Sequence, residues 1–185
     1  MSKRTGKPAS RGPARRRAMT SRMAIAVLVR ASAWRRRLPR VAGLCRRVAR
    51  AALAAVPGVP RDAELSIVLV DDADMRQLNR DFRGRDRPTN VLSFAGREGP
   101  ETPVVPGAPV GLGDVVLAFE TVAREACAQG KTLADHAAHL VVHGVLHLLG
   151  YDHERVRRAR QMEALEIAVL AGLGIGDPYR AGAVS

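Results

Sequence analysis

The chain has 185 residues and a formal net charge of +12 at pH 7, and its length suits one domain with a sizeable core. Cys45 and Cys127 lack the spacing of a metal site or a disulfide framework, so we expect reduced thiols in an intracellular protein. Aromatic residues make up only 3% of the chain, so base stacking is not expected to dominate any nucleic-acid contact. The longest apolar runs are also too short to predict a membrane-spanning helix.

The positive charge is concentrated at the start of the chain. Residues 1–50 contain 16 Lys or Arg and no acidic residue, whereas residues 51–185 contain 14 basic and 18 acidic residues, a net charge of −4. Residues 1–21 are also poor in hydrophobic residues, which predicts a disordered basic arm ahead of one folded domain at residues 22–180. Such an arm would follow RNA phosphates. A solvated tail, or a translation start placed too far upstream, is the alternative.

The first expected elements are a strand and a basic amphipathic helix. Residues 23–29 are apolar and favour an opening β-strand, although the basic residues before them also fit a short secretory signal. Between residues 34 and 56, apolar side chains recur at three- and four-residue steps, which predicts one helix. The simpler interpretation of its arginines is a solvated face. RNA contact is the alternative for Arg35, Arg36, Arg37, Arg46 and Arg47.

The middle of the chain predicts alternating strands and helices. The segment ELSIVLV at residues 64–70 indicates a strand, and a short helix is expected at residues 74–81. Gly- and Pro-rich residues 95–112 indicate a loop, and the GDVVLAF segment after it a further strand. Asp114 in that segment would lie near the metal face or cap a turn. A helix is then expected at residues 120–129.

An arginine-rich turn lies between residue 82 and a strand expected at residues 91–94. The guanidinium fork suits bidentate phosphate binding, so Arg83, Arg85 and Arg87 are candidates for RNA binding. Taken alone, an arginine-rich turn is more often solvated. The neighbouring polar residues would cap the turn or line a cleft: Thr89, Asn90 and Ser93.

The sequence HLVVHGVLHLLGYDH, residues 139–153, carries the strongest signal. His143 and His147 are one turn apart on an apolar helix that Thr132 is expected to cap, so two imidazoles face one ion. Gly150 suits the left-handed end of this helix, and the reversal would return His153 to the first two ligands. A single histidine here would usually be a core residue, but three at this spacing favour a metal site.

Three neutral imidazoles without a fourth protein ligand indicate an open, catalytic site. Nitrogen ligands favour Zn²⁺, with nickel, cobalt or copper as alternatives. Such an ion keeps its full charge, lowers the pKa of bound water and attracts an anionic substrate such as a phosphodiester. The metzincin peptidases share this spacing but have a glutamate base after the first histidine, where this chain has Gly144.

A helix is expected at residues 154–171. Glu163 and Glu166 could support the metal ligands, but surface ion pairs with the arginines at residues 155–160 are the preferred interpretation. Asp152 is the stronger candidate for such support, because it shares a turn with His153. The element pattern as a whole indicates one α+β or mixed α/β domain.

The segment HGVLHLLGYDH resembles the signature of the YbeY family, which are bacterial single-strand-specific metallo-endoribonucleases. Similar segments occur in the family's order across residues 62–179: ELSIVLVDD, LNRDFRGRDRPTNVLSF, GLGDVVLA, MEALE and GDPY.

The resemblance implies an α+β fold with a small mixed four-stranded sheet, about five helices and a metal site at the end of a buried helix. It implies a cytoplasmic enzyme that acts on single-stranded RNA and rRNA at the small ribosomal subunit, in maturation of the 3′ end of 16S rRNA and in ribosome quality control. His143, His147 and His153 would bind zinc, and Arg83 and His143 would be catalytic. A metallopeptidase and a non-catalytic ribosome-binding factor are the alternatives, and the oligomeric state stays open.

Overall fold

The computed structural model describes residues 23–96, 108–153 and 155–180. Within these ranges the chain has the expected α+β fold, with one helix more than predicted. The elements in chain order are β1 (Ala24–Val29), α1 (Ser32–Arg37), α2 (Val41–Ala55), β2 (Ala63–Val70), α3 (Asp72–Arg83), β3 (Val91–Ala95), β4 (Val110–Ala118), α4 (Phe119–Ala128), α5 (Leu133–Leu148) and α6 (Val156–Gly172). The basic arm predicted at residues 1–21 and most of the loop predicted at residues 95–112 lie outside the described residues.

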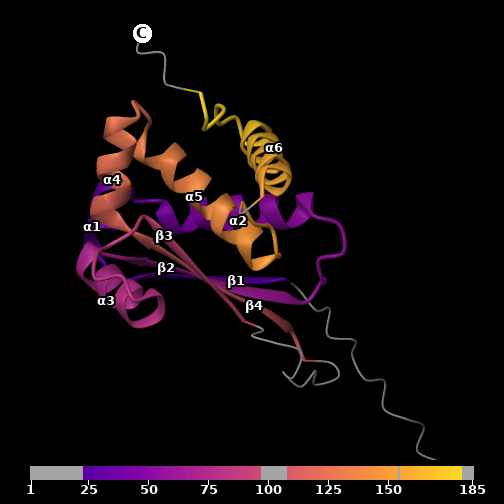
Figure 1. Cartoon of the computed structure of the whole chain (residues 1–185), viewed down its shortest axis with the longest axis horizontal. Helices are drawn as coiled ribbons and strands as arrows, with labels where there is room; N and C mark the ends of the chain where they lie inside the picture. The colour runs from indigo at the N-terminus through magenta and orange to yellow at the C-terminus, as the bar shows by residue number, and fades with distance from the viewer. Residues whose placement is uncertain (1–22, 97–107, 154, 181–185) are drawn as a thin grey trace, which may run out of the picture.

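The sheet is mixed, with strand order β1-β2-β4-β3 (Figure 1). β1 pairs with β2 and β2 pairs with β4 in parallel, whereas β3 runs antiparallel to β4 at the opposite edge. The strand predicted at residues 23–29 is therefore confirmed as β1. In the described ranges, no helix has the length and apolar character that crossing a bilayer requires.

Helices cover both faces of the sheet (Figure 1). On one face α2, α5 and α6 share the larger core with the sheet, which includes Ile67 of β2, Val115 of β4 and Val141 of α5. On the other face α3 packs over a smaller core that contains Met75. Because β3 is an edge strand with α5 beside it, side chains from both meet at the rim of the sheet.

The single helix predicted across residues 34–56 is wrong at its centre, because the chain forms α1 and α2 instead. The break falls at Leu38, whose φ of −140° and ψ of 76° are not helical. Pro39 follows it, and proline disfavours helical geometry in the preceding residue and lacks a backbone N–H. Trp34 is buried, and its indole N–H donates to the Val70 carbonyl oxygen at 3.0 Å.

Helix α5 begins and ends as the sequence predicts. The Thr132 hydroxyl oxygen accepts a hydrogen bond from the Asp135 backbone N–H at 3.0 Å, and the hydroxyl donates to the Asp135 carboxylate at 2.8 Å. At the other end Gly150 has a φ of +85°, a left-handed conformation that other residues rarely adopt. The chain therefore reverses direction immediately after α5.

Gly144 sets how closely α5 approaches the sheet. A Cβ atom at this position would lie 2.4 Å from Cγ1 of Val115 and 3.2 Å from Oγ of Ser93. Val115 is fully buried, so its side chain has no solvent to move into. The Ser93 hydroxyl donates to the Gly144 carbonyl oxygen at 3.2 Å, which ties α5 to β3. Close packing therefore requires glycine at this position.

We expect Gly144→Ala to lower the free energy of unfolding by about 1–3 kcal/mol relative to Gly43→Ala, because its added methyl group overpacks the core. Gly43 is an exposed residue inside α2 with open space where its Cβ would lie. Alanine there should therefore raise the free energy of unfolding by up to about 1 kcal/mol through helix propensity. Urea titrations of both variants measure the difference. Equal changes would contradict the packing role of Gly144.

Candidate metal centre

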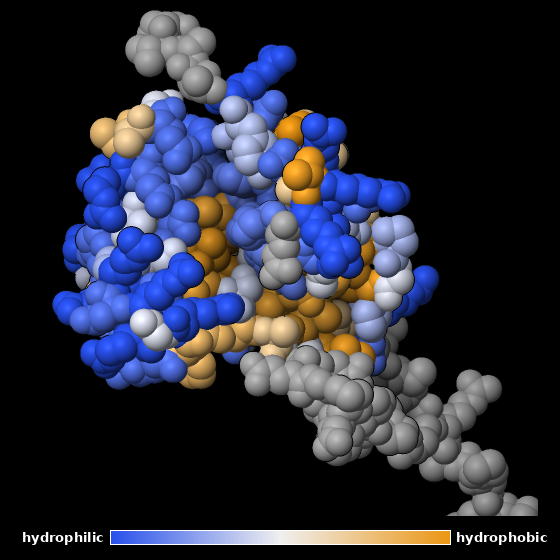
Figure 2. All heavy atoms as spheres, in the orientation of Figure 1, coloured by the Kyte–Doolittle hydropathy of each residue, from blue (hydrophilic) through white to orange (hydrophobic). Residues whose placement is uncertain are grey.

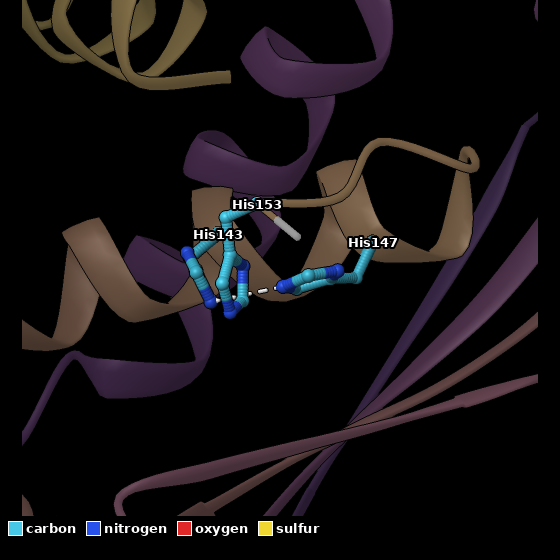
Figure 3. A group of neighbouring side chains, drawn as sticks. All are labelled: His143, His147 and His153. Carbon is cyan, nitrogen blue, oxygen red and sulfur yellow. Dashed lines mark hydrogen bonds between the residues drawn. The ribbon is translucent and has the colours of Figure 1, made fainter. Parts of the chain in front are cut away.

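Three histidines meet at the end of α5 (Figure 3). His143 and His147 project from successive turns of the helix, and His153 follows the reversal at Gly150. One ring nitrogen from each lies within 4.8 Å of those from the other two, and this is the spacing of a group that could hold a metal ion. The structure thus brings together the three residues that the sequence selects as ligands.

The surroundings of His147 favour its neutral imidazole, which is the form that binds metals. Burial, together with the neighbouring His143 and His153, lowers the pKa of the His147 imidazole below its usual value. A neutral imidazole retains the lone pair that a metal needs. His153 is exposed, so the group is open to solvent on one side.

A buried carboxylate stands behind His143, contrary to the preferred prediction for this helix. Glu166 of α6 is 0% exposed, so its predicted surface ion pair is wrong. Nδ1 of His143 lies 2.9 Å from one Glu166 oxygen, and Nε2 of His139 lies 2.9 Å from the other. The Tyr179 hydroxyl also donates to this carboxylate.

These contacts fix the charge and the role of Glu166. Burial alone would raise the pKa of its carboxyl group, but hydrogen bonds from His139, His143 and Tyr179 outweigh it and lower the pKa to about 2. An ionised carboxylate accepts the Nδ1–H of His143, which leaves the Nε2 lone pair directed toward His147 and His153. Glu166 therefore orients one candidate ligand.

The spacing of apolar residues in α6 indicates that Glu166 is buried, although the nearby arginines favour a surface ion pair. The buried residues of α6 are Met162, Glu166, Val169 and Leu170, a spacing of one helical face. Glu163 lies on the exposed face, close to the arginines that suggested surface pairing. His139 and Tyr179 were not predicted to belong to the site. His136, the remaining histidine, is buried and bonds to Glu125 at 2.9 Å.

Arg83 lies in the same hollow as the histidines. We call this the histidine hollow: it measures about 560 Å³, and its lining includes Arg83, Asn90, Ser93, His143, His147 and His153. Arg83 is the last residue of α3, which is longer than the helix predicted at residues 74–81. The Asp71 carboxylate caps its start, and Gly84, with a φ of +65°, ends it. Figure 2 shows this face, where hydrophilic side chains flank a hollowed hydrophobic strip.

Arg85 and Arg87 line a second, adjoining hollow. We call this the arginine hollow: it measures about 550 Å³, and the four arginines in its lining are Arg83, Arg85, Arg87 and Arg124. Thr89 and Asn90 line both hollows, as the cleft interpretation of these residues predicted. No local sequence pattern indicates Arg124, which α4 brings to the site from a distant part of the chain.

Two other acidic residues differ in their relation to the site. Asp152 lines the histidine hollow, and Arg158 donates a hydrogen bond to its carboxylate at 2.5 Å. Its support of a metal ligand stays a prediction. Asp114 is an exposed residue within β4, so both of its predicted positions are wrong. Val115 packs toward α5, and side-chain alternation along the strand therefore directs Asp114 to the other face.

The fold and the histidine group define an α+β domain with a potential metal centre beside an arginine-lined cleft. The family described as "Endoribonuclease YbeY" matches residues 35–174. A protein named Endoribonuclease YbeY from Paramagnetospirillum magneticum is 59% identical over 161 residues, which cover 87% of this chain and 98% of that protein. Its namesake from Azorhizobium caulinodans is 54% identical over 158 residues, which cover 85% and 96%. The chain belongs to the YbeY family.

Glu166→Gln should weaken the binding of Co²⁺ or Zn²⁺ by about 10- to 100-fold, because a neutral amide holds the His143 ring less firmly. Competition with a chelator measures the affinity, and the visible spectrum of bound Co²⁺ reports the ligand geometry. Glu163→Gln is the matched control, since it makes the same change on the exposed face of α6. Wild-type affinity and spectrum in Glu166→Gln would show that His143 does not depend on this carboxylate.

Proposed function

We propose that this protein is a metal-dependent endoribonuclease that hydrolyses phosphodiester bonds of single-stranded RNA. The observation that carries the proposal is the position of Arg83 in one hollow with His143, His147 and His153. A metal ion and a guanidinium group on either side of a phosphate would bind it and offset its negative charge. The name of the relatives supplies the reaction class, endoribonucleolytic cleavage.

Zinc is the proposed ion, with one per chain. Three imidazole nitrogens suit zinc, and nickel, cobalt or copper are the alternatives that the same donors accept. Among the described residues no carboxylate or thiol joins the group, which favours an open, catalytic site. Zinc with uncharged ligands supplies positive charge that stabilises a phosphate oxygen and activates water.

The remaining roles belong to side chains in the hollows. Arg83 would bind the scissile phosphate and stabilise the charge that develops on it during cleavage. His143 would present its Nε2 to the ion while Glu166 holds its Nδ1–H. Arg85 and Arg87 would bind phosphates further along the strand. Asp152 would support the ligands from its place beside His153.

A peptidase would need a general base that this fold does not accommodate at the expected position. That base would replace Gly144, where even a Cβ atom would overlap the buried Val115 side chain. A purely structural ribosome-binding factor would need the basic surface but no histidine group. Both alternatives are therefore weaker than a nuclease.

In the cell we propose a cytoplasmic role on ribosomal RNA. The resemblance of the sequence to the YbeY family supports maturation of the 3′ end of 16S rRNA and quality control at the small ribosomal subunit. The basic residues at positions 1–50 would add sequence-independent affinity for such an RNA.

His147→Ala should lose about one equivalent of metal and nearly all cleavage of single-stranded RNA, because two imidazoles hold an ion far more weakly than three. Elemental analysis and cleavage assays measure the two effects on the same preparation. His136→Gln, on the same helix but outside the group, is the control and should keep its metal. Double-stranded RNA and casein serve as comparison substrates. Full metal content in His147→Ala would refute the proposed ligand set.

Arg83→Ala and removal of residues 1–21 should change different kinetic constants. The truncation should weaken RNA binding and flatten its salt dependence, since the arm contacts phosphates without regard to sequence. Arg83→Ala should lower turnover at saturating RNA and shift the salt slope by no more than about one contact. Rates at several RNA concentrations and two salt levels separate these effects. Full turnover in Arg83→Ala would show that Arg83 is an ordinary surface arginine. Loss of turnover at saturating RNA in the truncated protein would show that the arm is part of the active site.

A further inference from the structure

We infer that the arginine hollow is a second phosphate subsite for the strand that is cut at the histidines, and that Arg124 of α4 is its principal contact. The inference rests on the proposed RNA cleavage. It adds Arg124, which α4 contributes to the hollow that Arg85 and Arg87 also line.

The two hollows adjoin each other along a shared wall. Five residues line both of them, and they come from the end of α3 and from the segment that leads into β3: Arg83, Thr89, Asn90, Val91 and Leu92. A strand that occupies the histidine hollow can therefore pass over this shared wall into the arginine hollow without leaving the surface.

The length of the cleft suits an extended strand. Between Asn90 and Ser93 the chain advances three residues into β3, about 10 Å at roughly 3.4 Å per residue. Along α5, the seven steps from His136 to His143 span about 10 Å at roughly 1.5 Å per residue. Asn90 and His136 mark the Arg124 end because both bond to Glu125 at 2.9 Å, and Ser93 and His143 mark the metal end. A short piece of single-stranded RNA reaches both ends.

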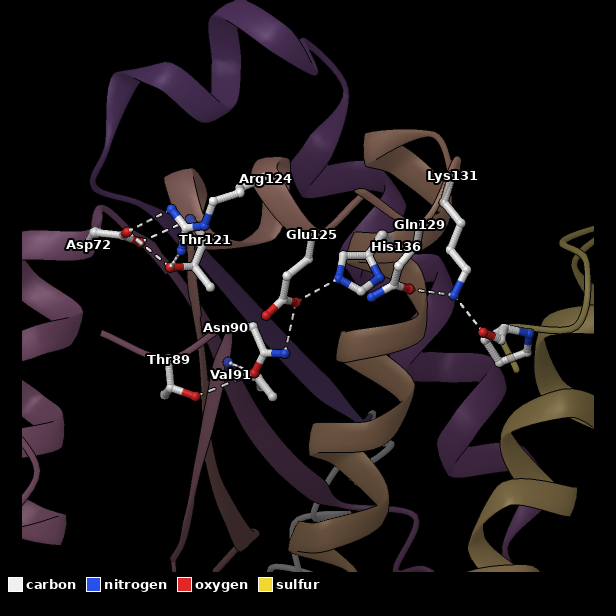
Figure 4. A network of polar contacts seen from close by, with 11 residues as sticks. Asp72, Thr89, Asn90, Val91, Thr121, Arg124, Glu125, Gln129, Lys131 and His136 are labelled. Carbon is white, nitrogen blue, oxygen red and sulfur yellow. Dashed lines mark hydrogen bonds and ion pairs between the residues drawn. The ribbon is translucent and has the colours of Figure 1, made fainter. Parts of the chain in front are cut away.

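The charge of the arginine hollow suits a phosphate. Its lining contains four arginines and one carboxylate, that of Glu125. Asn90 and His136 both bond to Oε2 of Glu125, as Figure 4 shows. The hollow therefore has an excess of positive charge at its mouth, where arginine side chains are exposed.

Arg124 is held in place but leaves much of its guanidinium group accessible. Its Nη2 donates to the Thr121 hydroxyl oxygen at 2.9 Å, and its Nη1 lies 3.8 Å from an Asp72 oxygen. Asp72 also accepts hydrogen bonds from the backbone N–H and the hydroxyl of Thr121, at 3.0 and 2.9 Å (Figure 4). The Arg124 side chain is 64% exposed and lines the hollow, so its guanidinium group is accessible to a phosphate. Because Thr121 and Asp72 already hold this group in place, binding costs little side-chain entropy.

The test compares single-stranded oligoribonucleotides of increasing length that are cleaved at the same bond. In the wild-type protein the KM should fall once the strand is long enough to reach the second subsite. Arg124→Gln keeps a donor for Thr121 but removes the charge, and it should raise the KM of the longer RNAs by about tenfold while the KM of the shortest changes little. Its salt slope on long RNA should fall by about one contact.

Two controls separate this inference from folding effects and from the proposed function. Arg124→Lys keeps the charge and should keep part of the dependence of KM on RNA length. Arg61→Ala removes an exposed arginine outside both hollows and should behave as wild type. Inorganic phosphate as a competitor distinguishes a subsite for RNA from one for the free ion. Wild-type length dependence in Arg124→Gln would overturn the subsite and leave RNA cleavage intact. A wild-type protein that cuts no RNA would overturn both.

Discussion

Helix α5 lies against β3 and β4 at a separation that only a glycine allows, and the arrangement of the cleft depends on that contact. Val115 and Ser93 occupy the space that a Cβ atom of Gly144 would take. The close approach places His143 at the rim of the sheet, where it lines one hollow with Arg83 of α3. A larger residue would push the helix outward and widen the gap between the candidate metal and phosphate ligands. Gly144 occupies the position of the general base of metzincins, and in this protein its role is to allow close packing.

Glu166 adds a second constraint, because it joins α5, α6 and the chain near Tyr179 through one buried carboxylate. Removing such a charge from water costs several kcal/mol, and its three hydrogen-bond donors offset that cost. The carboxylate that orients His143 therefore also fastens the segment after α6. The geometry of the candidate metal ligands and the docking of the segment after α6 are coupled through this group.

Local features of the site were predictable from the sequence, and tertiary ones were not. The three histidines and the turn at Gly150 depend on spacing within one helix and its reversal, which a sequence records directly. Pro39 also marked the break between α1 and α2, but the apolar periodicity across it favoured one helix. The arginines near Glu166 favour a surface ion pair in the sequence, although the spacing from Met162 puts Glu166 on the buried face of α6. Arg124 reaches the cleft only through the packing of α4, so no local pattern could reveal it.

The proposed metal centre consists of three imidazoles that bind one ion in an open site. X-ray absorption spectroscopy of the zinc-loaded protein tests this directly, because it counts and identifies the atoms around the metal. We predict three imidazole nitrogens at about 2.0–2.1 Å and a solvent oxygen that completes the coordination. A sulfur ligand at about 2.3 Å, or fewer than three imidazoles, would contradict it.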